Sequence, residues 1–172
     1  MRSSRFHPGW AILGAALFVL LSKVFVLDAA VVDGSSMRPT LEPGSLVLVL
    51  RCAYGLRSPS GYGYILRWAA PRRGDIVAAV NPRDGLPIVK RVGSVGPQSL
   101  AVDADRLVGP GLDAPLSAEE AARFGRGIEL SASELILLGD NPLESLDSRE
   151  YGPVPIEAVS GRVLSFGKWA RS

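Results

Sequence analysis

A serine on a turn and a lysine on a strand are the side chains of this sequence that could together carry out acyl transfer. Ser36 lies in the stretch DGSSMRPTL at 33–41, where Gly34 allows another backbone to approach and Pro39 fixes the path of the chain. Such a turn can present a hydroxyl as a nucleophile, although Gly, Ser and Pro also gather in ordinary loops. The hypothesis of a nucleophile therefore depends on a base elsewhere in the chain.

The base for this serine would have to be a lysine amine. The single histidine, His7, precedes a long apolar segment, and if that segment spans a membrane His7 lies on the opposite side from Ser36. Arginine side chains stay protonated and cannot accept the proton. Of the three lysines, Lys23 lies within the apolar segment and Lys168 lies near the C-terminus. Lys90 is the remaining candidate.

Lys90 lies on a predicted strand at 88–92, IVKRV. Alternation along a strand puts Lys90 on the same face as Ile88 and Val92. If that face is apolar, burial lowers the pKa of the amine from its usual value of about 10.4 and leaves a neutral base. A strand lysine can also be a solvated edge residue, so it is the pairing with Ser36 that favours catalysis.

Composition argues against several other classes of function. The 172-residue chain has a formal net charge of +2, and its basic residues are scattered rather than gathered in the stripe that nucleic acid requires. One cysteine, Cys52, allows no internal disulfide and cannot complete a zinc site with one histidine. We expect one domain with no metal, no cofactor and no nucleic-acid partner.

The apolar segment at 9–27, GWAILGAALFVLLSKVFVL, predicts a transmembrane helix. As a helix it would span roughly 28 Å, close to the thickness of a bilayer core. Basic residues precede it and acidic residues follow it, so the positive-inside rule places residues 1–8 in the cytoplasm and the domain at 28–172 outside. The alternative is a cleaved signal peptide, for which DAA at 28–30 is a poor cleavage site.

The region beyond this segment is predicted to be mainly β, with small antiparallel sheets. The continuous apolar run at 46–50 favours a strand buried on both faces, and the turn NPRDG joins the next two strands into a hairpin. The predicted strands are apolar runs bounded by turn residues, and they lie at 46–50, 76–80, 88–92, 135–138 and 156–166.

Two further segments have a distinct composition. Ser117 and Glu120 have the spacing of a capping box and predict a short helix that ends near Phe124. This helix would belong to a small appended region at about 103–133. Residues 51–70 are rich in Gly, Ser, Pro, Tyr and Trp and are predicted to be an exposed excursion, either at a membrane interface or as a surface hairpin.

Four motifs resemble those of type I signal peptidases and occur in the order of that family. They are SMRPTL at 36–41, RGDIV at 73–77, KRV at 90–92 and GDNPLESLDSR at 139–149, followed by YGPVP at 151–155. With the N-terminal apolar segment, they cover the chain from about residue 9 to residue 161. The resemblance implies a membrane-anchored serine endopeptidase that works by a Ser-Lys dyad.

The resemblance also implies roles for individual residues. Ser36 would be the nucleophile and Lys90 the general base, while Ser145 would orient the lysine amine. Asp147 and Arg149 would support the site as an ion pair. The backbone N–H of Ser36 would be one donor to the oxyanion.

The sequence departs from the family at two places. Some members carry a hydroxyl two residues before the nucleophile as a second oxyanion donor, but here that residue is Gly34, so backbone or water must serve. After KRV the family continues VGLPGD, whereas this chain has GSVGPQ at 93–98. We transfer no role to that loop.

The substrates implied by the resemblance are signal peptides of secreted preproteins with small residues at the −1 and −3 positions. An extended peptide can pair with a strand edge and place alternate side chains in shallow pockets. The candidate pocket walls flank the dyad, although each could equally be plain core: Val32, Met37, Leu41 and Val89.

The resemblance further implies a place in the cytoplasmic membrane, with the lipid bilayer and the protein-export machinery as partners. Two alternatives stay open. One is a dedicated processing peptidase of the mitochondrial inner-membrane type. The other is a catalytically silent β-domain that binds secreted peptides, for which Ser36→Ala would be harmless.

Overall fold

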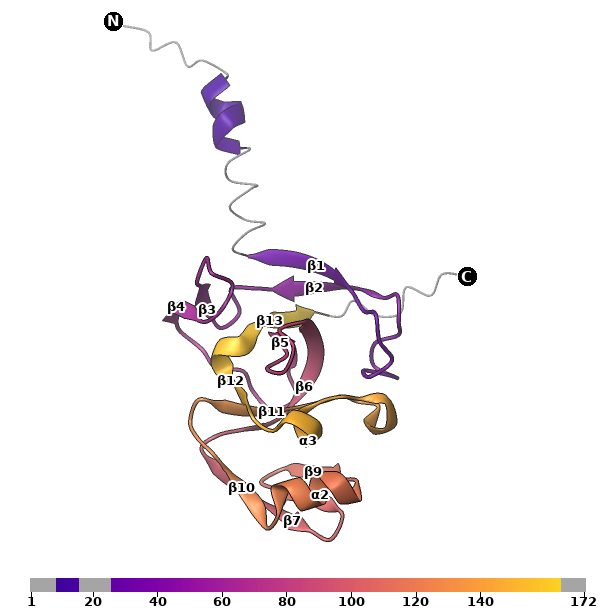
Figure 1. Cartoon of the computed structure of the whole chain (residues 1–172). Coiled ribbons are helices and arrows are strands. Elements are labelled where there is room, and N and C mark those ends of the chain that lie inside the picture. Colours follow the sequence, from indigo (N-terminus) through magenta and orange to yellow (C-terminus); the bar gives the residue numbers. More distant parts are fainter. Residues whose placement is uncertain (1–8, 16–25, 165–172) are drawn as a thin grey trace, which may run out of the picture.

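The computed structural model describes residues 9–15 and 26–164 (Figure 1). Their strands form a seven-stranded sheet, a four-stranded sheet and a two-stranded hairpin, all with antiparallel pairing. The prediction of a mainly β protein with antiparallel sheets is therefore confirmed.

The seven-stranded sheet is built from strands far apart in sequence. Its order is β1 (Leu27–Val31), β2 (Leu46–Leu50), β13 (Val159–Leu164), β5 (Ile76–Val80), β6 (Pro87–Val95), β11 (Glu134–Leu138) and β12 (Val154–Pro155). The last long strand, β13, lies between β2 and β5 in this sheet and so joins the N-terminal strands to the rest (Figure 1).

The hairpin of β5 and β6 is the element that positions Lys90, and it forms as predicted. Val77 lies opposite Lys90 in the antiparallel register, and Val80 lies opposite Pro87. β6 continues to Val95, where it pairs with β11. The last strand begins at Val159, three residues later than the prediction, because Ile156–Ala158 form a 3-10 turn.

The prediction that β2 is buried on both faces is wrong. Val47 and Val49 are buried, but Leu46 is 67% exposed. Both neighbours of β2 are strands of the same sheet, so they cover its edges and leave one of its faces open at this end.

Two apolar clusters lie on the two faces of this sheet. The first contains Val77 and Val92 from the hairpin together with residues of β11, β12 and the segment that follows it. The second contains Met37 and Leu41 from the turn after β1, packed on Val47 and Val49 of β2. Alternate residues of β6 therefore face different clusters.

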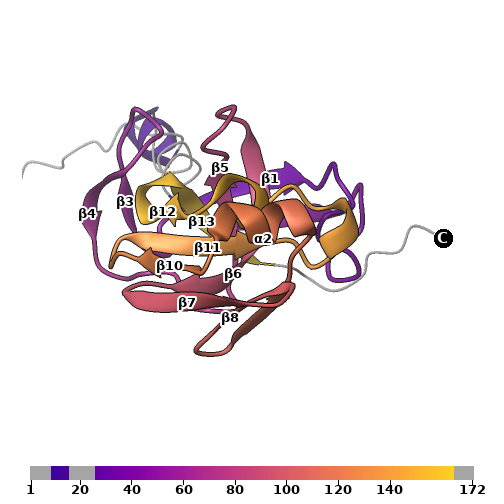
Figure 2. The ribbon, with the colours of Figure 1, turned by 60° about the horizontal axis from the view of Figure 1, so that its bottom comes forward.

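The four-stranded sheet lies on the β11 side of the molecule, away from β1 and β2, in both views (Figures 1 and 2). Its order is β10 (Gly127–Leu130), β7 (Gln98–Asp103), β8 (Arg106–Gly109) and β9 (Leu112–Pro115). The helix α2 (Ala118–Phe124) packs on it through Phe124, and Ile136 of β11 joins the same apolar cluster. The appended region predicted at 103–133 therefore starts earlier, at β7.

The predicted capping box of α2 is confirmed. The Ser117 hydroxyl accepts a hydrogen bond from the Glu120 N–H, and the Glu120 carboxylate accepts one from the Ser117 N–H. Two N–H groups that the helix cannot pair internally are thus satisfied, which is why this short helix begins where the sequence predicted.

The excursion at 51–70 is a hairpin of β3 (Gly55–Arg57) and β4 (Tyr64–Arg67). This segment was expected to be exposed, but part of it is buried. Tyr54 is buried because its ring joins the first apolar cluster and its hydroxyl donates to Asp75 at 2.9 Å. Trp68 is exposed.

The predicted transmembrane segment at 9–27 lies partly outside the described residues. Residues 9–15 are helical, and Leu27, its expected last residue, is the first residue of β1. Across 9–15 and 26–164, no helix has the length and apolar character needed to cross a bilayer.

Candidate active site

The turn that carries Ser36 follows β1 and is fixed by its own backbone and by its buried side chains. The N–H of Arg38 donates to the Ser35 carbonyl at 3.0 Å, and the N–H of Leu41 donates to the Met37 carbonyl at 2.9 Å. Met37 and Leu41 are buried in the second apolar cluster. Ser36, which directly precedes Met37, is half-buried.

Lys90 is a buried lysine, 4% exposed, on the face of β6 that also carries Val92. Its amine donates a hydrogen bond to the Ser145 hydroxyl at 3.0 Å. Burial lowers the pKa of Lys90 from its ordinary value, the nearby charge of Arg149 acts in the same direction, and the Asp147 carboxylate opposes them. The amine is thus biased towards the neutral form that can accept a proton.

Ser145 is held by a buried carboxylate. Its hydroxyl donates to Asp147 Oδ2 at 2.5 Å. The Arg149 guanidinium donates to both oxygens of Asp147, with Nε to Oδ1 at 2.9 Å and Nη2 to Oδ2 at 2.6 Å. The N–H of Gly139 donates to the same carboxylate at 2.8 Å.

The carboxyl group of Asp147 is held in its charged form. Burial alone would raise the pKa of Asp147, but the hydrogen bonds from Arg149, Gly139 and Ser145 outweigh it and leave the pKa below its ordinary value. Asp147 is therefore an acceptor only, and the proton of the Ser145 hydroxyl must point at it. The lone pairs of Ser145 remain for the amine of Lys90.

Gly139 allows the turn that carries Ser36 to lie close to Ser145 and Asp147. A Cβ at this position would stand 2.1 Å from the Ser145 hydroxyl oxygen and 2.6 Å from the Ser36 carbonyl oxygen. The N–H of Asn141 donates to that same carbonyl at 2.9 Å. Within residues 9–15 and 26–164 the Ser36 hydroxyl has no hydrogen-bond partner, so it is available to an incoming group.

Arg91 makes a second ion pair beside the site. Its Nε and Nη2 donate to the two oxygens of Asp140 at 2.7 Å each, and its Nη1 donates to the Gly74 carbonyl at 2.9 Å. Nη2 also reaches Thr40 Oγ1 at 3.3 Å. This side chain therefore connects all four sequence motifs. Sequence reasoning assigned it no partner, although alternation places it on the face opposite Lys90.

The four predicted pocket walls differ in exposure. Val32, Met37 and Leu41 are buried side chains of the second cluster, whereas Val89 is half-buried and packs against it. Val89 is thus the one of the four with surface to offer a substrate. Its partner across the hairpin, Ala78, is also half-buried, and the register of the predicted hairpin could have identified it.

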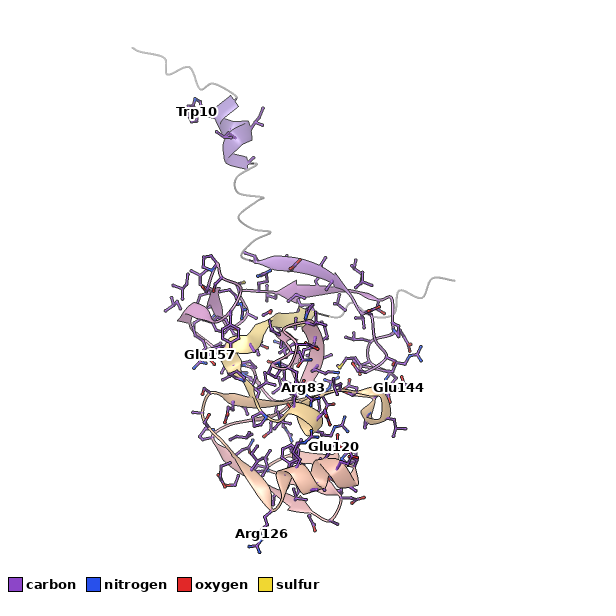
Figure 3. The ribbon with its side chains drawn as sticks, viewed as in Figure 1. Trp10, Arg83, Glu120, Arg126, Glu144 and Glu157 are labelled. Atoms are coloured by element: carbon purple, nitrogen blue, oxygen red, sulfur yellow. The ribbon has the colours of Figure 1, made fainter. Side chains whose placement is uncertain are left out.

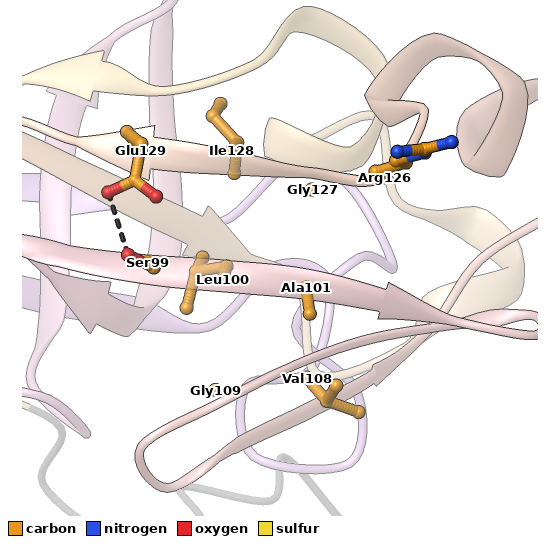
Figure 4. Close-up of a pocket in the computed structure, with 9 residues that line it drawn as sticks. All are labelled: Ser99, Leu100, Ala101, Val108, Gly109, Arg126, Gly127, Ile128 and Glu129. Carbon is orange, nitrogen blue, oxygen red and sulfur yellow. Dashed lines mark hydrogen bonds between the residues drawn. The ribbon is translucent and has the colours of Figure 1, made fainter.

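A shallow groove of about 560 Å³ lies elsewhere, on the four-stranded sheet (Figure 4). It is lined by residues of β7, β8 and β10, and none of the dyad or support residues takes part. In the part of the chain that the structure describes, no cluster of three or more His, Cys, Asp or Glu could hold a metal ion.

The chain belongs to the family described as signal peptidase, peptidase S26, whose model matches residues 5–167. The signal peptidase I of Bacillus caldolyticus is 29% identical over 167 residues, which cover 93% of this chain and 89% of that protein. The family resemblance of the four motifs is therefore confirmed.

Other relatives match to different extents. The signal peptidase I of Buchnera aphidicola subsp. Schizaphis graminum is 30% identical over 88 residues, 51% of this chain but only 28% of that protein. The mitochondrial inner membrane protease subunit 1 of Schizosaccharomyces pombe is 27% identical, covering 90% of this chain and 82% of that protein. A solved signal peptidase I from Enterococcus faecalis has a TM-score of 0.40 and 27% identity, over 55% of this chain and 97% of that one.

Proposed function

We propose that this protein is a serine endopeptidase that removes N-terminal signal peptides from secreted preproteins by means of Ser36 and Lys90. The observation that carries the proposal is the burial of Lys90 with its amine hydrogen-bonded to Ser145, beside the turn of Ser36. Lys90 is the one lysine among the described residues. Membership of the peptidase S26 family supports the same chemistry.

The reaction starts from the neutral amine of Lys90. The amine accepts the proton of the Ser36 hydroxyl as the oxygen attacks the scissile carbonyl carbon. The negative charge that develops on the carbonyl oxygen is stabilised by the Ser36 N–H. The ammonium of Lys90 then returns the proton to the departing amine nitrogen, which leaves an acyl ester on Ser36.

Hydrolysis of the ester repeats these steps with water. Lys90 accepts a proton from the water as its oxygen attacks the ester carbonyl, and the proton then returns to the Ser36 oxygen. The peptide carboxylate and the free enzyme are regenerated. Ser145 acts here as a positioning residue, because an N–H of Lys90 that donates to Ser145 fixes the direction of the remaining lone pair.

The edge of β6 next to Lys90 is suited to an extended peptide. Residues Pro87–Val89 pair with β5 on one side, while β11 begins to pair with β6 only at Arg91. The open side can accept a peptide as an added strand. Val89 on this edge is half-buried, so part of its side chain can contact such a peptide.

We propose the cellular setting on the sequence alone. A helix that begins at residue 9 and ends before β1 would span the cytoplasmic membrane, with residues 1–8 in the cytoplasm and the catalytic domain outside. The partners would be signal peptides, the lipid bilayer and, functionally, the protein-export machinery.

One of the relatives supports the alternative of a dedicated processing peptidase. The match to the fission yeast mitochondrial inner membrane protease subunit spans most of both chains, so a peptidase dedicated to a few membrane or envelope proteins would use the same site. A panel of preproteins separates the two activities, because a dedicated peptidase would cut only a few of them.

Cleavage of a detergent-solubilised preprotein by wild type and by Ser36→Ala tests the proposal directly. We expect the wild type to cut after a small residue, as read by sequencing the junction, and Ser36→Ala to leave the preprotein intact while keeping its melting temperature. Ser99→Ala, a serine of the four-stranded sheet, is the matched control and should cut normally. If the wild type and Ser36→Ala both bind the preprotein without cutting it, a silent peptide-binding domain is the better account.

A further inference from the structure

Three hydrogen bonds tie the turn of Ser36 to the loop between β11 and α3 (Ser148–Tyr151). The Asn141 N–H donates to the Ser36 carbonyl at 2.9 Å, and the Asn141 side-chain amide donates to the Ser35 carbonyl at 3.4 Å. The third bond joins two side chains, because the Ser35 hydroxyl donates to the Glu144 carboxylate. Glu144 projects from this loop beside the turn (Figure 3).

The Ser35–Glu144 bond lies one residue from the nucleophile on one segment of chain and one residue from the positioning residue Ser145 on the other. Ser35 directly precedes Ser36, and Glu144 directly precedes Ser145, the hydrogen-bond partner of Lys90. A shift of either backbone therefore changes the separation of the Ser36 hydroxyl and the Lys90 amine.

The family resemblance assigns no role to either residue. Ser35 lies one position before the motif SMRPTL, and Glu144 lies inside the motif at 139–149, directly before Ser145. Among the residues that the structure describes, no arginine or lysine pairs with Glu144, so its contact with Ser35 is not a by-product of an ion pair.

We propose that Ser35 and Glu144 are positioning residues that hold the Ser36 nucleophile in register with Lys90; this inference rests on the proposed function. Glu144 is exposed and Ser35 is half-buried, so their bond contributes little to the stability of the fold. The rate of the catalytic step depends more strongly on the position of the nucleophile than the stability of the fold does, since a misplacement of about 1 Å can lower a rate by about 100-fold. The pair therefore acts on the catalytic step.

The test uses the full chain with a preprotein substrate and the variants Ser35→Ala, Glu144→Ala and the double variant. We expect each single variant to lower kcat by about tenfold with KM unchanged, and the double variant to be no slower than either one. Glu144→Gln keeps an acceptor oxygen and should retain most of the rate. The melting temperature should stay at the wild-type value.

A pH profile distinguishes positioning from a general loosening of the site. Ser35→Ala removes no atom that buries Lys90, so kcat should fall at every pH without a shift in the midpoint of its rise with pH. A loosened site would let water reach Lys90 and move that midpoint upward, which would count against the proposal.

A matched control exists on the four-stranded sheet. There the Ser99 hydroxyl donates to the Glu129 carboxylate at 2.7 Å, on the surface and outside the catalytic cluster (Figure 4). Ser99→Ala and Glu129→Ala should leave kcat unchanged.

The outcomes separate this inference from the proposed function. Wild-type rates in both Ser35→Ala and Glu144→Ala, or a double variant slowed by the product of the two single effects, would overturn the positioning role alone. A wild-type protein that cuts no preprotein would overturn the proposed function and this inference with it.

Discussion

A buried amine with a single hydroxyl partner defines the chemistry of Lys90. The Asp147 carboxylate, whose charge acts on Lys90, is already bonded by Arg149, Gly139 and Ser145, and among the described residues it makes no ion pair with the amine. Burial can therefore dominate, and the pKa of Lys90 is lowered from its ordinary value of 10.5. The folded chain then binds fewer protons than the unfolded chain between the lowered pKa and 10.5.

The activity and the stability of the wild type should both depend on pH through Lys90. Cleavage should rise with pH as Lys90 loses its proton, with a midpoint below 10.5, and should fall as the pH is lowered. Stability should also rise with pH across the same window, because the unfolded state there binds more protons. Rate profiles and thermal melts measure both effects.

Lys90→Met provides the comparison for that profile. It removes the base and the titration together, so cleavage should be lost and the pH dependence of stability should flatten in this window. Cleavage at the wild-type rate by Lys90→Met would rule out the dyad.

At the scale of elements, the candidate site forms where two segments meet the hairpin of β5 and β6. One is the turn that carries Ser36, and the other is the loop between β11 and α3. The sequence predicted that hairpin because apolar alternation and a strong turn signal are local. Through a motif it also predicted that Ser145, Asp147 and Arg149 lie at the site, and their hydrogen bonds place them beside Lys90. The bonds of Arg91 and Glu144 were not predictable, because they join residues about 50 and 109 positions away that only tertiary packing brings together.

Gly139 is where the crowding of these segments can be tested. Gly139→Ala would place a methyl group 2.1 Å from the Ser145 hydroxyl and 2.6 Å from the Ser36 carbonyl, forcing the two apart. We expect the rate of preprotein cleavage to fall by about 100-fold, with a loss of stability of about 1–3 kcal/mol from overpacking.

Gly109→Ala is the control for that variant. Its added methyl would stand 2.2 Å from Leu100 Cδ2, within the four-stranded sheet. It should lower the melting temperature while leaving kcat unchanged. Equal losses of kcat in the two variants would show that crowding anywhere in the fold impairs the enzyme.

At the scale of the whole molecule, the order of the strands in the seven-stranded sheet could not be predicted from the sequence. The insertion of β13 between β2 and β5 pairs residues 80 or more positions apart, such as Arg162 with Val77. The four-stranded sheet was missed for another reason. Its strands are short and carry charged or polar residues such as Asp103 and Glu129, so their apolar alternation is weak.

The central place of β13 predicts a strong effect of a side chain at Gly161. A Cβ there would stand 2.6 Å from the Leu50 carbonyl oxygen and 3.0 Å from Arg51 Cα, which are backbone atoms of or next to β2. Gly161→Val should separate β13 from β2 and destabilise the fold by about 3 kcal/mol or more.

Chemical denaturation measures this loss, and Ser160→Val on the same strand is the comparison. Ser160 is half-exposed, and a β-branched residue suits a strand, so that variant should change stability by about 1 kcal/mol or less. Similar losses of stability in the two variants would argue against the idea that a side chain at residue 161 forces β13 away from β2.

The position of β13 also sets an order of events during biosynthesis. All the residues assigned to the site, from Ser36 to Arg149, leave the ribosome before Val159, the first residue of the strand that closes the large sheet. A nascent chain therefore holds every reactive group while β2 and β5 still lack their shared neighbour. The large sheet is therefore completed only after every residue assigned to the site has been synthesised.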